Sequence, residues 1–120
     1  MPDRPVKRGE IYYYDFGRGY GSVQGGKRPA LVVQDDKANA RSSTTVVVPL
    51  TRTIRKAWLD CHVLLDKDCG LTNDSMAMIE QIRAVNQADL ADYIGRISEP
   101  MQRMIDKSLR NSLGGYRPKR

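Results

Sequence analysis

The sequence predicts a mainly β protein, a small antiparallel β-barrel with one helix at its C-terminal end. Three observations point to this fold class. Short runs rich in Val, Ile and Tyr alternate with polar or Gly-rich clusters, which is typical of strands joined by turns. One stretch near the end repeats apolar residues at helical intervals. The chain has 120 residues, which is the length of one domain, so these elements share a single core.

The first predicted strand begins directly after Gly9. Residues 10–16 (EIYYYDF) are rich in Tyr and Ile, and residues 28–36 and 44–51 contain β-branched runs that are too short for helices. Further strands are predicted at 61–66, 75–85 and 93–98, with a single helical turn at 86–91. Many short strands and one terminal helix favour a barrel with the helix packed on it.

Residues 17–26 form a long Gly-studded loop between the first two predicted strands. A dinucleotide-binding loop opens a helix, whereas this one leads into a strand, so that kind of site is excluded. The loop also lacks a Gly-Lys-Ser/Thr ending, which excludes a triphosphate-binding loop. Two interpretations remain open: a plain hairpin connection, or the wall of a binding groove.

Pro49 interrupts the third predicted strand. Proline has no N–H to donate to a β-ladder, so we expect it at a sheet edge or a bulge. Leu50 and Thr51, which follow it, are then directed away from the regular pairing.

The last element is predicted to be an amphipathic helix. Its apolar stripe consists of Met101, Met104, Ile105, Leu109 and Leu113. Ser98 is the expected N-cap, with Pro100 in the first turn and Gly114-Gly115 as the stop.

Composition excludes two broad classes. No apolar run approaches the roughly 20 residues that cross a bilayer. The N-terminal residues 1–5 (MPDRP) have no apolar segment behind their charges, so we expect no secretory signal and a cytosolic location.

The cysteines and the single histidine argue against a structural metal. Cys61 and Cys69 are the only cysteines, one disulfide is an unusual framework for a domain of this size, and we expect reduced thiols. His62 is the only histidine and there is no Cys-x-x-Cys, so we expect no closed zinc site. A lone histidine also cannot form a two-histidine acid–base pair, and we expect His62 to be a hydrogen-bonded strand residue.

The positive charge is concentrated in the first half of the chain. The net charge is +6, and residues 16–34 and 37–59 contain basic side chains and no acid. Residues 60–116 carry more acids than bases. This asymmetry favours a surface that faces a polyanion, although solvated faces of mixed charge also produce such gaps.

Arg28 has a restrained backbone because Pro29 follows it and disfavours the helical region. A restrained guanidinium is a good fork for a phosphate. An ion pair at a strand edge is the equally open alternative for this residue taken alone.

Three motifs in order resemble the MazF/PemK-type toxin family. They are VKRGEIY at 6–12, GSVQGGKRP at 21–29 and EQIR at 80–83. The resemblance covers 6–114 and implies one domain over 1–120, with a basic tail at 115–120 that we expect to be frayed. It also implies an SH3-like barrel with a C-terminal helix, shared with CcdB-type toxins. The implied partners are a second copy of the chain and an antitoxin with an acidic, flexible segment.

The activity that the resemblance implies is sequence-specific cleavage of single-stranded RNA, without the ribosome and without a cofactor or metal. The family's catalytic arginine falls on Arg28 and its catalytic threonine on Thr51. RNA cleaves itself when a 2′-hydroxyl attacks the adjacent phosphorus, so the protein needs to supply only alignment, charge stabilisation and proton transfer. The general base is unassigned, and Val23 stands where the family commonly has an acid.

The residues expected to bind RNA offer stacking surfaces, hydrogen bonds or charge to unstacked nucleotides. They are Tyr20, Ser22, Gln24, Lys27, Trp58 and Gln81. Core or dimer packing is an equally good interpretation of Trp58.

Two other functions remain possible for the same fold. CcdB-type toxins bind DNA gyrase through a C-terminal Trp-Gly-Ile, whereas residues 116–120 read YRPKR and the sole Trp is Trp58. A passive RNA-binding barrel explains the basic segregation, but not the joint presence of Arg28 and Thr51.

Overall fold

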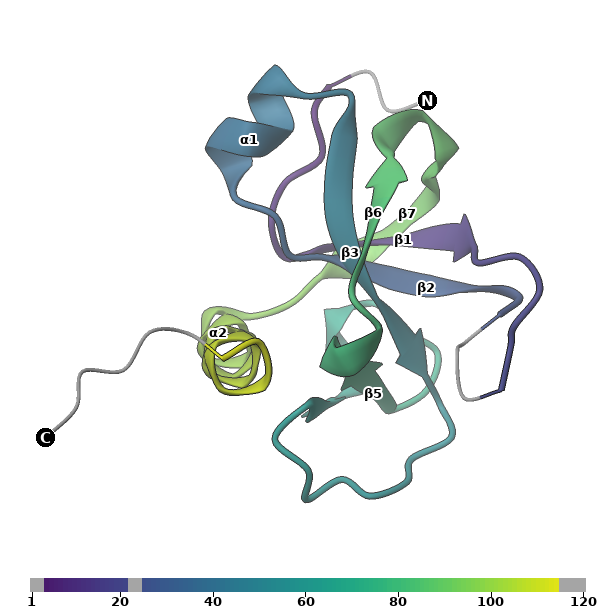
Figure 1. Ribbon diagram of the computed structural model, residues 1–120, viewed down its shortest axis with the longest axis vertical. Coiled ribbons are helices and arrows are strands. Elements are labelled where there is room, and N and C mark those ends of the chain that lie inside the picture. Colours follow the sequence, from purple (N-terminus) through teal and green to yellow (C-terminus); the bar gives the residue numbers. More distant parts are fainter. Residues whose placement is uncertain (1–3, 22–24, 115–120) are drawn as a thin grey trace, which may run out of the picture.

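The computed structural model describes residues 4–21 and 25–114, in which an antiparallel sheet packs against a C-terminal helix (Figure 1). The strands are β1 (Glu10–Asp15), β2 (Lys27–Val32), β3 (Thr44–Thr51), β4 (His62–Leu65), β5 (Ser75–Met78), β6 (Arg83–Asn86) and β7 (Ala91–Arg96). The helices are α1 (Asp36–Arg41) and α2 (Glu99–Ser112), with 3₁₀ turns η1 (Lys67–Cys69), η2 (Ile79–Gln81) and η3 (Gln87–Asp89).

Strand β3 organises the sheet because it has partners along both edges. The hydrogen-bonded order is β4-β5-β3-β2-β1-β7, and β6 also pairs with β3. The first half of β3 pairs with β6 and its end, Leu50 and Thr51, pairs with β5. The mainly β fold with a C-terminal helix is confirmed. The sheet of this small barrel is not closed, since β4 and β7 end the path without pairing with each other in the described residues.

The pairing of β3 with two different strands along one edge explains one wrong strand prediction. Residues 75–85 were expected to form one strand, but they form β5 and β6 with η2 between them. Met76 pairs with Thr51 at one end of β3, while Arg83 pairs with Val47 further back. The chain therefore shifts along β3 through a helical turn. The turn expected at 86–91 is confirmed as η3.

Helix α1 replaces the end of the strand predicted at 28–36. Asp35 caps this helix by accepting a hydrogen bond from the N–H of Lys37 at 3.0 Å. Asn39, which is 1% exposed, donates to the carbonyl of Gln34 at 3.0 Å and accepts from the hydroxyl of Thr45 at 2.6 Å. A six-residue helix is too short to show an apolar period, so capping and a buried amide determine it rather than an amphipathic face.

Two prolines end the ladder between β2 and β3. The paired residues run from Val32 with Val47 to Ala30 with Pro49, and the next residue of β2 is Pro29. Pro49 was expected at an edge or bulge, yet it lies in the central strand, at the step between the β6 and β5 pairings. The missing N–H groups fall where pairing stops or changes partner. The two strands separate beyond this point (Figure 1).

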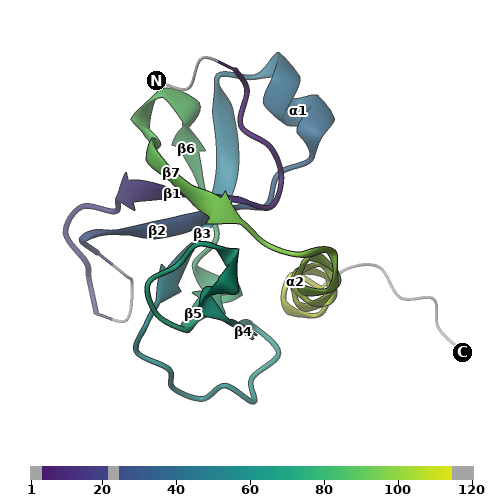
Figure 2. The same cartoon turned by 180° about the vertical axis from the view of Figure 1, so that it is seen from behind.

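Helix α2 covers the β4–β5 end of the sheet, as the view from behind shows (Figure 2). Ser98 accepts a hydrogen bond from the N–H of Met101 at 3.3 Å, which confirms the predicted cap. Ile105 is fully buried, with Met101 and Leu109 packed around it. Met104 and Leu113 were predicted in the same stripe but are 49% and 57% exposed, so the buried stripe is narrower than expected.

Both cysteines are free thiols, as predicted. In the described part of the chain, neither helix combines the length and the apolar composition needed to cross a membrane.

Candidate active-site cleft

A cleft of about 370 Å³ opens where β2 and β3 separate. Its lining comes from β1, the start of β2, the end of β3 with the residues after it, and the segment that leads into β5. The lining residues are Tyr13, Lys27, Arg28, Pro29, Leu50, Thr51, Arg52, Thr53, Leu71, Thr72, Asn73 and Ser75. The sheet topology thus brings four separated segments of the chain to one surface.

Arg28 and Thr51 both line this cleft because β2 and β3 are neighbouring strands. The ladder pairs Leu31 with Val48 and Ala30 with Pro49. Arg28 comes two residues before Ala30, and Thr51 two residues after Pro49, so both lie just beyond the end of the ladder. Side chains two residues apart along a strand lie on one face, so both belong to the same face as Ala30 and Pro49. The structure therefore brings together the two residues predicted to be catalytic.

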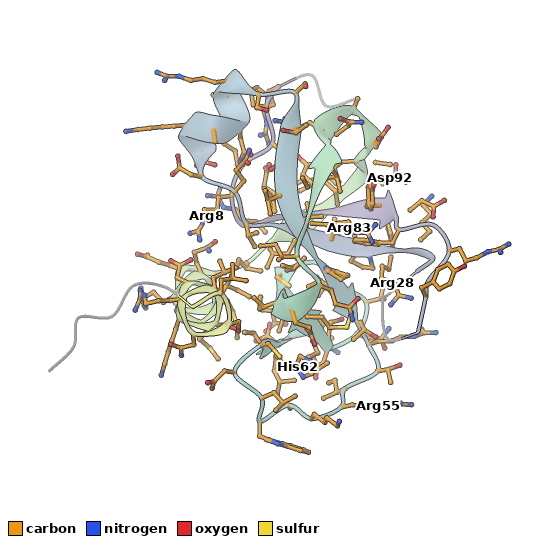
Figure 3. The ribbon with its side chains drawn as sticks, viewed as in Figure 1. Arg8, Arg28, Arg55, His62, Arg83 and Asp92 are labelled. Carbon is orange, nitrogen blue, oxygen red and sulfur yellow. The ribbon has the colours of Figure 1, made fainter. Side chains whose placement is uncertain are left out.

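The side chain of Arg28 is oriented by the loop before it. Its Nε donates to the carbonyl oxygen of Gly25 at 2.9 Å. A Cβ on Gly25 would lie 2.2 Å from the backbone nitrogen of Gly19, so this close approach requires glycine. Arg28 is half-buried and lines the cleft with its Nε held by the backbone. Figure 3 shows Arg28 at the hairpin end of β2.

The neck of the hairpin loop is closed by backbone hydrogen bonds. The N–H of Phe16 donates to Gly26 at 3.0 Å, and the N–H of Gly26 donates to Gly17 at 2.7 Å. Gly26 has a φ of +83°, which favours glycine. Tyr20, on the loop itself, is 79% exposed, whereas Ser22, Val23 and Gln24 lie outside the described residues.

Thr51 is 9% exposed at the end of β3, and its hydroxyl has a defined local partner. Oγ1 accepts a hydrogen bond from the N–H of Thr53 at 3.1 Å. An oxygen that accepts still carries its own proton, which a hydroxyl can donate to a ligand in the cleft.

The described lining of the cleft is positively charged, with Lys27, Arg28 and Arg52 and no carboxylate. Lys27 also lies 5.9 Å from the centre of the Tyr13 ring, at cation–π range. The basic surface at the cleft is smaller than the charge distribution along the sequence predicts. Lys37 and Arg41 belong to α1, at the opposite end of the molecule from the loop after β3 (Figure 1).

Like Tyr20, two further residues predicted to bind RNA lie outside the cleft lining. Trp58 is 79% exposed in the loop between β3 and β4. Gln81, half-buried at the end of η2, has its Nε2 4.0 Å from the Sδ of Met78. Their roles in RNA binding, like that of Tyr20, stay predictions.

Sequence reasoning missed the contribution of the turn before β5. Thr72, Asn73 and Ser75 reach the cleft because β5 pairs with the end of β3, a long-range pairing that no local pattern announces. The sequence does indicate a place for Arg52 and Thr53 near the site, since they directly follow Thr51 in a stretch without acids.

His62 is hydrogen-bonded at both ring nitrogens, as expected of a strand histidine. Nδ1 lies 2.9 Å from the carbonyl oxygen of Lys56, and Nε2 lies 2.8 Å from Oε2 of Glu80. Burial by itself lowers the pKa of His62, but these hydrogen bonds raise it above its ordinary value. The residue is well separated from Arg28 (Figure 3). Cys61 and Glu80 lie beside it and could hold a metal ion with it.

Comparison with known proteins decides the family. The sequence model of a family described as PemK-like, MazF-like toxin of type II toxin–antitoxin system matches residues 7–113. The chain belongs to this family. The toxin resemblance predicted from three short motifs is thereby confirmed over nearly the whole length of the chain.

Relatives of this PemK/MazF-family chain include one curated enzyme at high identity. Endoribonuclease EndoA of Bacillus subtilis (strain 168) is 41% identical over 109 residues, which span 90% of this chain and 94% of that protein. A mycobacterial endoribonuclease solved in complex with its cognate antitoxin has a TM-score of 0.78 at 26% identity, covering 94% of this chain and 99% of that one. MazF of Deinococcus radiodurans has a TM-score of 0.77 at 20% identity, covering 93% and 99%, and supports the fold.

Proposed function

We propose that this toxin cleaves single-stranded RNA in the cleft between β2 and β3, with Arg28 and Thr51 as its catalytic residues. The endoribonuclease class follows from the family and from the 41% identity with EndoA. One observation supports the assignment of the site. Arg28 and Thr51 line a single cleft that contains three cations and no carboxylate among its described lining residues.

The reaction uses a nucleophile that the substrate carries. The 2′-oxygen of a ribose attacks the adjacent phosphorus and the bond from phosphorus to the 5′-oxygen breaks. The products are a 2′,3′-cyclic phosphate and a 5′-hydroxyl. The proton of the 2′-hydroxyl is lost to a base and the departing 5′-oxygen gains one. The step therefore requires charge stabilisation and alignment from the protein, and needs no metal ion.

Arg28 neutralises the charge that develops on the non-bridging phosphoryl oxygens. Its Nη groups form a planar fork that matches two such oxygens, and the bond from Nε to Gly25 fixes the plane of the fork. Arg28 is a poor proton donor, because a guanidinium keeps its proton to a pKa above about 12. Its role is electrostatic.

Thr51 donates its hydroxyl proton to a non-bridging oxygen of the same phosphate. The bond that Oγ1 accepts from Thr53 orients the hydroxyl, so little reorganisation is needed when the phosphate binds. Lys27 and Arg52, which also line the cleft, hold the phosphates on either side.

We assign sequence specificity to the residues that the sequence predicts to bind RNA. Tyr20 and Trp58 offer exposed aromatic faces for stacking. Ser22, Gln24 and Gln81 are polar residues that can bond to base edges. The cleft is formed by the protein alone, so we propose that it cleaves an unstructured strand without the ribosome.

The proposed partners are a second copy of the chain and an antitoxin. A mycobacterial endoribonuclease of the same fold was solved with its cognate antitoxin. An acidic antitoxin segment fits a cleft whose described lining carries only positive charge. We place the protein in the cytoplasm as a single domain over 1–120, with its core at 6–114; the basic tail predicted at 115–120 lies outside the described residues.

The test compares two oligonucleotides of one sequence, all-ribose and all-deoxy, in buffer with EDTA. The protein is expected to cut the first and leave the second whole, because the deoxy strand lacks the nucleophile. Arg28→Ala should abolish cutting with an unchanged circular dichroism spectrum. Arg41→Ala, an exposed arginine on α1, is the matched control and should cut normally. Equal cutting of both strands would reject the mechanism.

A further inference from the structure

A second cluster of reactive side chains lies outside the cleft. A sulfur of Cys61, a ring nitrogen of His62 and a carboxylate oxygen of Glu80 lie within 4.8 Å of one another. The cluster forms because β4 pairs with β5, with His62 opposite Met78, and because η2 follows β5 directly. The N–H of Ile79 donates to the carbonyl of Cys61 at 2.8 Å, which ties the two segments together.

The ring of His62 is oriented as in a metal ligand. The carbonyl oxygen of Lys56 can only accept, so Nδ1 carries the proton and donates to it at 2.9 Å. Histidine ligands of metals usually donate their second ring nitrogen to a carbonyl or carboxylate in this way, which fixes the tautomer. The lone pair of the neutral ring is then on Nε2, which faces Glu80 at 2.8 Å.

A shared proton holds Nε2 and the carboxylate oxygen of Glu80 2.8 Å apart. A divalent metal can replace that proton, bonding to Nε2 and to the carboxylate together. The thiol of Cys61 adds a soft donor on the same side.

The same three residues do not form a nucleophilic cysteine site. Both ring nitrogens of His62 are engaged, by Lys56 and by Glu80, so neither is placed to take the thiol proton. A metal ion binds cysteine as the thiolate, so binding displaces the thiol proton of Cys61.

We propose that Cys61, His62 and Glu80 bind a divalent transition metal of the zinc class, one ion per chain. One sulfur, one nitrogen and one oxygen donor suit Zn²⁺ and disfavour Mg²⁺, which takes oxygen ligands. Bonds of about 2.0–2.3 Å to a tetrahedral ion separate donors by about 3.3–3.8 Å, so small side-chain shifts complete the site. The fourth position is open to water.

A metal ion bound at this site would stabilise the conformation of the loop between β3 and β4. Lys56 has a φ of +50°, a left-handed conformation that is uncommon outside glycine. Its carbonyl accepts from the N–H of Leu59 at 3.1 Å as well as from His62. A metal on His62 therefore stabilises the strained turn, in a loop whose first residues, Arg52 and Thr53, line the cleft.

The test uses untagged, reduced, full-length protein stripped of metal and titrated with Co²⁺. We expect one equivalent to give a near-ultraviolet charge-transfer band from thiolate to cobalt, abolished by Zn²⁺ and unaffected by excess Mg²⁺. Cys61→Ser should lose the band and Glu80→Gln should weaken binding by about tenfold or more. Cys69→Ser is the matched control and should keep the band, because Cys69 is the other free thiol and lies outside the cluster.

Proteolysis supplies a second readout that is independent of RNA cleavage. Zn²⁺ should slow cutting by trypsin after Arg55 and Lys56 in the native protein, and Cys61→Ser should remove that protection. Cys61→Ser should still cut RNA, so a failure here is distinguishable from a failure of the proposed nuclease. No band in folded wild-type protein, or a band that survives Cys61→Ser and disappears with Cys69→Ser, would overturn the metal site.

Discussion

The Nε of Arg28 donates to the carbonyl oxygen of Gly25, 2.9 Å away, so the guanidinium that we propose as catalytic is anchored by the backbone of the loop that precedes it. The anchor uses the one N–H that is not part of the terminal fork. The two Nη groups form the planar fork that a phosphate can bind. The geometry links the glycines of the hairpin loop to the chemistry of the cleft.

Replacing Arg28 by lysine tests this anchor while keeping the positive charge. Lysine has neither a donor at the Nε position nor a planar fork. Arg28→Lys is therefore expected to reduce the single-turnover cleavage rate by about 100-fold or more, in the range found when an oriented donor to a developing anion is lost. A variant that retains most of its rate would show that charge alone suffices.

Gly25→Ala tests the anchor from the other side. The added methyl group would overlap the backbone of Gly19 at 2.2 Å, so the loop must move and Gly25 O with it. We expect slower cleavage with Arg28 itself intact. Gly21→Ala is the control, since a Cβ there meets nothing within 4 Å and its φ of +54° adds only backbone strain. If Gly25→Ala and Gly21→Ala cleave RNA at equal rates, the position of the Gly25 carbonyl does not affect catalysis.

Two substitutions test Thr51, one that keeps its hydroxyl and one that removes it. Thr51→Ser keeps the hydroxyl that accepts from Thr53 and donates to the substrate, so it should retain most of the activity. Thr51→Val keeps the shape and loses the hydroxyl. It should cleave more slowly and lose about 1 kcal/mol of stability through the unpaired N–H of Thr53. Cleavage rates and urea denaturation of both variants provide the measurement, and normal turnover by the valine variant would clear Thr51 of a catalytic role.

Glu10 provides a pH-dependent contribution to stability. Burial of this residue, which is 3% exposed, by itself raises its pKa, but hydrogen bonds from Arg4, from the N–H of Lys7 and from Tyr12 outweigh burial and lower it below 4.5. A pKa lowered by folding means that the unfolded state binds the proton more readily. The contribution is present at neutral pH and is lost as the pH falls below about 4.5 through the folded value.

Glu10→Gln should therefore be less stable than the wild type at neutral pH, with a difference that narrows on acidification. Chemical denaturation at several pH values between neutral and about 3 measures it. A constant difference across that range would mean that the carboxylate charge is not involved. The pKa of Tyr12 is shifted upward, whereas that of Glu10 is lowered. Burial and Glu10 raise the pKa of Tyr12 to about 12, so Tyr12 remains a neutral donor to Glu10.

Helix α2 offers a test of which apolar residues hold it. Ile105 is fully buried in the core and Met104 is 49% exposed to solvent, although both belong to the same sequence stripe. Ile105→Ala is expected to cost about 2–5 kcal/mol and Met104→Ala less than about 1. Thermal and urea unfolding of the two variants measure the difference, and equal losses would mean that solution packing of α2 differs from this structure.

Much of the fold was predictable because local signals agreed with the tertiary structure. The β-branched run at 44–51 has the bounds of β3, and Ser98 caps α2 where a serine before Pro100 predicted it. Helix α1 was missed because a buried amide, Asn39, and the Asp35 cap determine it. The break in 75–85 was missed because it follows from the two partners of β3, which only the sheet topology reveals.

Part of the candidate site could likewise be predicted from the sequence, and part depends on the sheet topology. Arg28 and Thr51 were predicted from motifs, but their meeting depends on the register between β2 and β3. Asn73 and its neighbours enter the cleft through the β3–β5 pairing, which has no local signature. The Cys61, His62 and Glu80 cluster was hidden by sequence spacing, since Glu80 reaches the other two only across the β4–β5 pair.

The ends of the RNA fragments test the central claim most directly. If the substrate's own 2′-oxygen breaks the chain beside Arg28 and Thr51, mass spectrometry of products made in EDTA will show a 2′,3′-cyclic phosphate on one fragment and a 5′-hydroxyl on the next. A single deoxyribose at the cut position will block that cut alone. Fragments that carry 5′-phosphates, or cutting that continues past the deoxyribose, would contradict the account.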